Sequence, residues 1–214
     1  MLIIYKIIAF LIAISVHEAA HAWMANRLGD PTARLQGRMT LNPLKHLDLY
    51  GTIIVPLFLI LFGSPFVFGW AKPVGFDPFN LKNPRKDAGL ISLSGPVANF
   101  ITAVIFALVV RLASGPFSIL AILLPLFYLI IVINLVLAVF NLIPIHPLDG
   151  GKILVAILPP KEAEETDKFL NQYGLIIIFM LIFLSYRGVS PLNAFLSPII
   201  NFLINLLLPQ GNLI

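Results

Sequence analysis

The sequence contains no cysteine and few charged residues. Without cysteine, the chain can form neither a disulfide framework nor a metal site built on thiolates. Charged residues make up 11% of the 214 residues, whereas a soluble domain has about 25%. Since 59% of the residues are hydrophobic, the chain lacks the polar surface to face water on all sides. The composition predicts an integral membrane protein, and the basic residues lie in loops rather than on one face, which argues against nucleic-acid binding.

Apolar runs divide the chain into segments. They cover residues 2–24, 49–70, 88–113, 117–145, 173–186 and 192–208. A helix needs about 20 residues to cross the hydrocarbon layer, but the second run is interrupted by glycine and proline, which suits a segment that enters the membrane and returns. The expected fold class is an all-α polytopic membrane protein with about five transmembrane helices, a small β-hairpin over 32–42 and a re-entrant segment over 49–70. The alternative of a cleaved secretion signal is disfavoured because Lys6 lies inside the first run rather than before it.

The distribution of basic residues supports the re-entrant prediction. If residues 49–70 cross the membrane, six Lys and Arg residues lie on one side and eight on the other. If the segment returns, Lys6, Arg111 and Arg187 share one side and the other eleven share the opposite side. The positive-inside rule prefers the second arrangement. We therefore expect a multi-pass protein of the plasma membrane whose first helix ends at the cytoplasmic face.

The first apolar run ends in a sequence with metal-ligand spacing. His17-Glu18-Ala19-Ala20-His21 is an HExxH motif, and residues four apart lie on one face of a helix. Both imidazoles can then reach one zinc ion, while Glu18 lies beside it as a general base for water. The competing interpretation is a pair of packed histidines in a helix bundle. Ionisable groups within a membrane span are costly and usually functional, which favours the metal site.

Asp149 is the best candidate for a third ligand. It follows the long apolar run in Asn141–Lys152 (NLIPIHPLDGGK), where prolines break the helix and glycines free the backbone. A helix cap at the membrane edge would also suit this aspartate. His21 and Asp149 both lie at the late ends of their helices, so they meet only if these helices run in the same direction. The re-entrant arrangement satisfies this condition, because one span separates the two helices.

These motifs resemble those of the site-2 proteases, the intramembrane zinc metalloproteases. The resemblance rests on HEAAHAW, GRMTLNPLKHLD, GWAKPV, SGPVANF and NLIPIHPLDGGK, and extends from the first helix to Lys152. It implies that His17, His21 and Asp149 hold one zinc ion and that Glu18 activates water. It also implies that Asn141 steadies the substrate carbonyl or its oxyanion. The family's short form, without an inserted peptide-binding domain, is the nearest match, and its β-rich, membrane-dipping element accords with residues 32–70.

The resemblance implies hydrolysis of a peptide bond in or near a transmembrane helix of a membrane-protein substrate. We expect residues 1–152 to form the protease core, with the helices, the 32–70 element and the LDG turn at 148–150. Residues 153–214 would add an amphipathic segment and one or two further transmembrane helices. We hypothesise that residues 32–42 or 49–70 pair with the unwound substrate by strand addition. The rival functions are a divalent-metal carrier, in which Glu18→Gln would alter flux only modestly, and a non-catalytic scaffold, which has no need of buried charge.

Three further polar residues have more than one interpretation. His146 could be a fourth ligand, a partner of a ligand or a polar lining residue, but a fourth protein ligand would close a site that needs an open position. Asn99 could line the substrate path or make a hydrogen bond between helices. His46, in a basic loop, is expected at the surface.

Overall fold

The computed structural model describes residues 2–62, 72–113, 119–186 and 191–208. These residues form the helices α1 (Leu2–Leu28), α2 (Thr32–Leu35), α3 (Val55–Leu61), α4 (Pro84–Ala113), α5 (Leu124–Asn141), α6 (Asp149–Ile157), α7 (Pro160–Tyr186) and α8 (Pro191–Leu207). The 3-10 turns η1 (Pro43–Lys45), η3 (Pro78–Asn80) and η4 (Ile119–Leu123) and the π-helical turn η2 (Leu49–Ile54) complete the elements. The mostly helical fold agrees with the predicted class.

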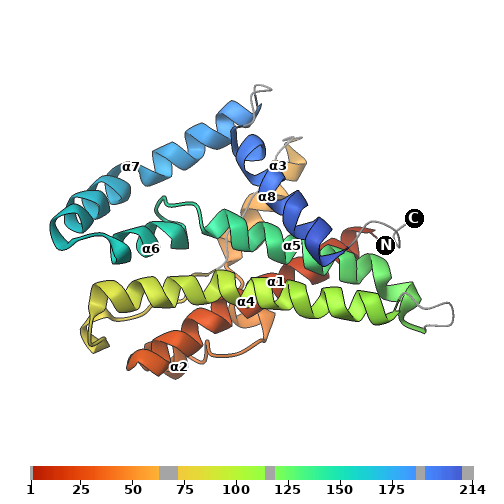
Figure 1. The fold of residues 1–214 in the computed structure, drawn as a ribbon, viewed down its shortest axis with the longest axis horizontal. Helices are drawn as coiled ribbons and strands as arrows, with labels where there is room; N and C mark the ends of the chain where they lie inside the picture. Colours follow the sequence, from red (N-terminus) through yellow and green to blue (C-terminus); the bar gives the residue numbers. More distant parts are fainter. Residues whose placement is uncertain (1, 63–71, 114–118, 187–190, 209–214) are drawn as a thin grey trace.

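Helices α1, α4 and α5 form the centre of the molecule. Helix α4 packs against α1, α5 and α6, and it runs opposite to α1 and α5, which share one direction (Figure 1). The buried faces are rich in small residues, among them Ala13, Ala22, Ala103, Ala107 and Ala138. In lipid, small side chains let helices approach closely, and van der Waals packing then holds them together. The sequence analysis required these two helices to run in the same direction if His21 and Asp149 are to lie close together, and α1 and α5 do so.

Three of the described helices are long and apolar enough to cross a membrane: Leu2–Leu28, Pro84–Ala113 and Leu120–Asn141, where the last includes most of η4. The shorter apolar segment Ala194–Leu207 lies in α8. Helix α7 includes the predicted run 173–186 but begins earlier, and its first turns contain the charged sequence KEAEETDK, where Glu164 and Lys168 form an exposed ion pair. The expected helix over 117–145 ends at Asn141, before Pro144, because proline disfavours helical conformation in the residue preceding it.

The predicted β-hairpin over 32–42 is wrong: the described residues contain no strand, and Thr32–Leu35 forms the short helix α2. Backbone hydrogen bonds from Leu35 to Pro31 and from Gln36 to Thr32 close this turn. The buried carboxylate of Asp30 supports it by accepting hydrogen bonds from the backbone N–H and the hydroxyl of Thr32. These local side-chain hydrogen bonds therefore outweigh the weak apolar alternation that suggested strands.

Asp30 also ties the end of α1 to the loop before α4. Its carboxylate accepts hydrogen bonds from the side-chain amide of Asn80 at 2.8 Å and from the backbone N–H of Asp77 at 2.9 Å. Burial raises the pKa of Asp30, but the hydrogen bonds from Thr32, Asn80 and the Asp77 backbone outweigh burial and hold the pKa below its usual range. The aspartate therefore fixes the course of residues 72–80.

The two ends of the segment 47–71 meet. The backbone N–H of Lys72 donates a hydrogen bond of 2.9 Å to the carbonyl oxygen of His46. His46 is fully buried, and its Nε2 lies 2.8 Å from the carbonyl oxygen of Thr40, which corrects its expected surface position. The Arg38 guanidinium adds a hydrogen bond to the Pro73 carbonyl at 2.7 Å. Residues 63–71, in the predicted re-entrant run, lie outside the described residues.

Candidate metal centre

The two histidines of the HExxH motif lie on the face of α1 that packs against α4. Both side chains are buried, and their Nε2 atoms are 3.0 Å apart. This proximity follows from the four-residue spacing, which stacks the side chains one helical turn apart. Two imidazole nitrogens therefore point to one place inside the bundle.

Asp149 supplies a third group at the same place. It begins α6, after the turn that ends α5, and its Oδ2 lies 3.1 Å from His17 Nε2 and 3.3 Å from His21 Nε2. A side chain at Gly150 would overlap the carbonyl oxygens of Leu142 and Ile143, so only glycine allows this tight return of the chain. Among the described residues, His17, His21 and Asp149 form a group whose ligand atoms all lie within 4.8 Å of one another.

The outer nitrogens of both imidazoles are bonded to acceptors. His17 Nδ1 lies 2.6 Å from the Oδ1 of Asn99, and His21 Nδ1 lies 2.7 Å from the carbonyl oxygen of Ile91. An acceptor at Nδ1 places a proton there, so the neutral form of each imidazole carries its lone pair on Nε2. In this neutral form, two lone pairs and a carboxylate oxygen converge without a proton between them. This arrangement calls for a cation, and the outer hydrogen bonds are of the kind that orient metal-bound histidines.

The three donors fit zinc. Ligands held at about 2.0–2.1 Å in a tetrahedron lie about 3.3 Å apart, close to the 3.0, 3.1 and 3.3 Å found between these atoms. The buried Oδ2 of Asp149 has no hydrogen-bond partner among the described residues, as expected for an atom reserved for a metal. Two imidazoles and one carboxylate are also a catalytic zinc set that leaves one position open.

Glu18 lies beside the three donors and is held in place from a different part of the chain. Its Oε2 accepts a hydrogen bond of 2.9 Å from the backbone N–H of Val74, in the loop that Asp30 anchors. Its Oε1 has no partner in the part of the chain that the structure describes. One carboxylate oxygen is therefore fixed while the other is available to accept a proton.

Gly95 provides the space for the two imidazoles. A Cβ at this position of α4 would lie 2.5 Å from His21 Nε2 and 2.7 Å from His17 Cε1, closer than side chains can approach. Glycine is therefore required at position 95, within the Ser94–Phe100 motif, for the two imidazoles to fit. The sequence showed this glycine but not which helix face it occupies.

All five residues predicted for the site line one cavity of about 130 Å³: His17, Glu18, His21, Asn141 and Asp149. Their placement together agrees with the sequence analysis, and their roles are taken up below as a proposal. Asn141 ends α5 and donates one amide hydrogen to the Leu137 carbonyl at 3.0 Å, so the second amide hydrogen is available. His146 is not part of the metal-binding group; its Nε2 lies 3.0 Å from an oxygen of Asp167.

The sequence analysis left open the role of Asn99, and the structure assigns it to a network behind His17. Besides its contact with His17, Asn99 donates to the Ala13 carbonyl at 2.9 Å and to Asn134 Oδ1 at 2.8 Å. Asn134 in turn donates to the Ile130 carbonyl at 2.8 Å, and both asparagines are fully buried. The network joins α1, α4 and α5 at the level of the metal donors. The only signal in the sequence was a polar residue in an apolar helix.

Known proteins support this chemistry. The family model described as Peptidase family M50 matches residues 5–122 and 111–181. The chain is 40% identical over 203 residues to YwhC of Bacillus subtilis (strain 168), which is named, provisionally, a zinc metalloprotease; the match covers 92% of this chain and 86% of YwhC. It is 29% identical over 182 residues to Rip2 of Mycolicibacterium smegmatis, named in the same way, with 84% of this chain and 66% of Rip2 covered.

A third relative is archaeal. The zinc metalloprotease MJ0392 of Methanocaldococcus jannaschii is 38% identical over 89 residues, which cover 42% of this chain and 25% of that protein. No solved structure gives a significant match. The family model covers most of the chain, including both metal-ligand motifs. With three apolar helices around the site, the chain belongs to Peptidase family M50, the site-2 proteases, and is an intramembrane zinc metalloprotease.

Proposed function

We propose that His17, His21 and Asp149 hold the catalytic zinc ion and that Glu18 is the general base for hydrolysis of a peptide bond in a transmembrane helix. The observation that carries this proposal is the convergence of three potential ligand atoms, each within 3.3 Å of the others, beside a carboxylate with one free oxygen. When bound, zinc polarises the scissile carbonyl and lowers the pKa of the attacking water toward about 7.

Side chains of the protein accept and return the proton of the attacking water. Glu18 Oε1 accepts a proton from water as the water oxygen bonds to the carbonyl carbon of the substrate, while the Val74 N–H keeps the carboxylate in position. The free amide hydrogen of Asn141 is donated to the carbonyl oxygen as negative charge develops there. Glu18 then gives its proton to the amide nitrogen as the C–N bond breaks. The products are a free carboxylate and a free amine.

The substrate is a membrane protein whose scissile bond lies within or beside a transmembrane helix. The site lies among helices that are long and apolar enough to cross a membrane, on the half of α1 that leads to its C-terminal end. A substrate helix must unwind locally to expose its carbonyl, because its backbone groups are already hydrogen-bonded. The site residues lie within 1–152, which we take as the protease core, and 153–214 contribute α7, α8 and most of α6.

We further propose that the chain crosses the membrane five times and that residues 49–70 enter and leave on the cytoplasmic side of the plasma membrane. Support comes from the hydrogen bond between Lys72 and His46, which joins the chain on the two sides of this segment. The basic residues add to it, since eleven of them then share the cytoplasmic side. Helices α7 and α8 supply the fourth and fifth crossings.

The catalytic proposal is tested by zinc analysis of purified protein together with cleavage of a single-span model substrate. Wild type should contain about one zinc per chain and cleave the substrate. Glu18→Gln should retain the zinc, because Glu18 is not a ligand, and should lose cleavage by at least about 1,000-fold. A Glu18→Gln protein that cleaves normally, or that instead transports zinc like the wild type, would refute the assignment.

The topology can be mapped with single cysteines, since the chain has none of its own. Leu41→Cys and Phe79→Cys, both at exposed positions on either side of the segment, should react with an impermeant maleimide in inverted membrane vesicles. Leu112→Cys, at the end of α4, should react in right-side-out vesicles. Labelling of residues 41 and 79 from opposite sides would show that residues 49–70 cross the membrane.

A further inference from the structure

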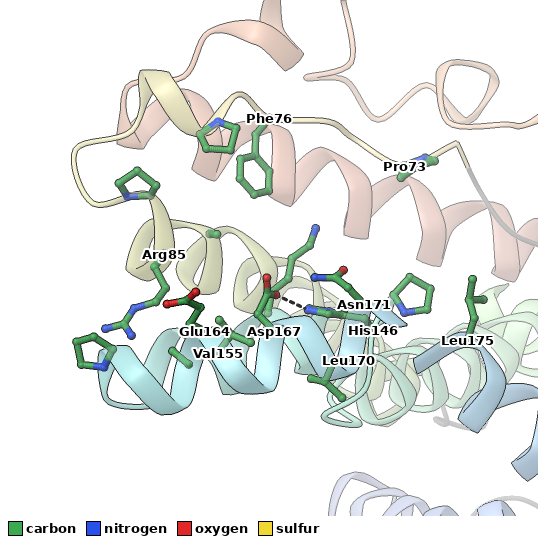
Figure 2. A pocket seen from close by; sticks show the side chains of 17 residues that line it. Pro73, Phe76, Arg85, His146, Val155, Glu164, Asp167, Leu170, Asn171 and Leu175 are labelled. Atoms are coloured by element: carbon green, nitrogen blue, oxygen red, sulfur yellow. Dashed lines mark hydrogen bonds and ion pairs between the residues drawn. The ribbon is translucent and has the colours of Figure 1, made fainter. Parts of the chain in front are cut away.

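A second, larger cavity adjoins the metal centre. This cleft, of about 740 Å³, lies between the first turn of α4, helix α6 and the charged turns of α7 (Figure 2). It shares four lining residues with the metal cavity: Pro73, Phe76, Pro147 and Lys152. A polypeptide extended through the metal site therefore has a continuous wall to follow into the cleft. The volume is typical of protein ligand sites.

The acidic groups of the cleft already have basic partners. Asp167 lies 3.0 Å from His146 Nε2, a contact drawn in Figure 2, and Glu164 lies 2.7 Å from the ammonium group of Lys168. Both acids are on α7, so they form one wall of the cleft. Glu164 is therefore paired with an ammonium group and Asp167 with an imidazole, so neither carboxylate is left without a partner.

The basic groups of the cleft lack such partners. Arg85, in the first turn of α4, has a buried Nη1 without an acceptor, and no ion pair of Arg85 with a carboxylate occurs among the described residues. Lys152, on α6, also has no acidic partner there; its ammonium group lies 5.2 Å from the centre of the Phe76 ring. An unpaired buried guanidinium nitrogen is costly. Among the charged groups that line the cleft, those without a partner in the described part of the chain are therefore the cationic ones, Arg85 and Lys152.

We propose that this cleft binds an acidic segment of the substrate that flanks the cleaved transmembrane helix. The inference rests on the proposed function, since it extends the path of the substrate beyond the metal site. A carboxylate can accept a charge-assisted hydrogen bond from the Arg85 guanidinium, and Lys152 stands at the junction of the two cavities. The shared wall favours a polypeptide over a lipid head group, because only a polypeptide is required to continue from one cavity into the other.

Binding is measured separately from cleavage, in the Glu18→Gln protein. The protein is placed in nanodiscs of zwitterionic lipid and titrated with fluorescent single-span peptides. These carry three aspartates at the N-terminal flank, three aspartates at the C-terminal flank, or three asparagines at both. One of the two acidic peptides should bind about tenfold more tightly than the neutral peptide, as expected for charge-assisted hydrogen bonds at a partly desolvated arginine.

Substitutions on α4 locate the effect. Arg85→Gln should reduce the preference for the acidic peptide to less than about twofold, whereas Lys86→Gln should keep it, because Lys86 is exposed and does not line the cleft. Arg85→Glu should prefer a peptide with three lysines at the same flank. Such an inversion cannot result from misfolding.

Three outcomes would overturn the proposal. The first is equal binding of the acidic and neutral peptides, and the second is a loss of preference in Lys86→Gln as large as that in Arg85→Gln. The third is acidic-peptide binding that anionic lipid abolishes when Arg85 is present but not in Arg85→Gln, which would assign the cleft to a lipid head group. Since the assay needs no catalysis, these outcomes are independent of cleavage. A failure of the catalytic proposal would appear instead in the zinc content and in the cleavage of wild type against Glu18→Gln.

Discussion

Removing the side chain of Asn99 should weaken zinc binding although Asn99 does not reach the metal. In Asn99→Ala, the Nδ1–H of His17 loses the acceptor that lies 2.6 Å away, so the ring is no longer fixed in the tautomer with a free Nε2. Loss of such an outer partner typically lowers metal affinity 10- to 100-fold, about 1.4–2.7 kcal/mol. The carbonyl of Ala13 and Oδ1 of Asn134 also lose donors, which should lower the free energy of unfolding by about 1–3 kcal/mol for each group left unpaired.

Asn134→Ala is the matched control for Asn99→Ala. It removes a buried asparagine of the same network that contacts Asn99 but not His17. Its thermal stability should fall, while its zinc affinity stays within about threefold of wild type, because the outer partner of His17 is retained. The two quantities are measured in detergent, by chelator competition for zinc and by thermal unfolding. Wild-type zinc affinity in a folded Asn99→Ala protein, or an equal loss of affinity in Asn134→Ala, would refute the assignment of Asn99 as an orienting residue.

Three further predictions concern the metal and the fold. Gly95→Ala should lose zinc while keeping its helical circular dichroism, since the new Cβ displaces both imidazoles; Gly75→Ala, with open space around it, should keep zinc. Asp30→Asn should lower the melting temperature at pH 7. Because the pKa of Asp30 is lowered in the fold, its stabilising contribution is complete above the unfolded pKa of about 3.9 and is lost as the pH falls through the lower folded pKa. The difference between variant and wild type should therefore begin to narrow below about pH 4 and disappear below the folded pKa. Removal of zinc by a chelator should lower the free energy of unfolding of wild type and Glu18→Gln by about 4 kcal/mol, compared with protein in free zinc at 1,000 times the Kd. The free energy of unfolding of His21→Ala, which lacks one ligand, should be nearly unchanged.

The local part of the site was predictable because it depends on helix geometry alone. The four-residue spacing of His17 and His21 places both rings on one face of any α-helix. Asp149 was predictable because the prolines and glycines before and after it end one helix and redirect the chain. The distribution of Lys and Arg residues then indicated that the helices before His21 and before Asp149 run in the same direction, which places Asp149 on the same side of the membrane as the two histidines.

The partners of these residues depend on how α4 is rotated against α1, which no local pattern reveals. In the sequence, Gly95 and Asn99 look like other small or polar residues of apolar helices. In the structure, Gly95 leaves room for the two imidazoles and Asn99 orients the ring of His17. The hairpin over 32–42 was wrong for a different reason. Its few alternating residues are a weaker signal than the Asp30 carboxylate, which accepts hydrogen bonds from the backbone N–H and the hydroxyl of Thr32, the first residue of α2.

The contact between His46 and Lys72 has a practical consequence for protein engineering. Since the segment between them starts and finishes at one backbone hydrogen bond, its length does not determine the distance between α1 and α4. The segment can therefore be replaced as a unit. Swapping it for the equivalent stretch of another protease would exchange this segment while leaving the metal donors in their original frame.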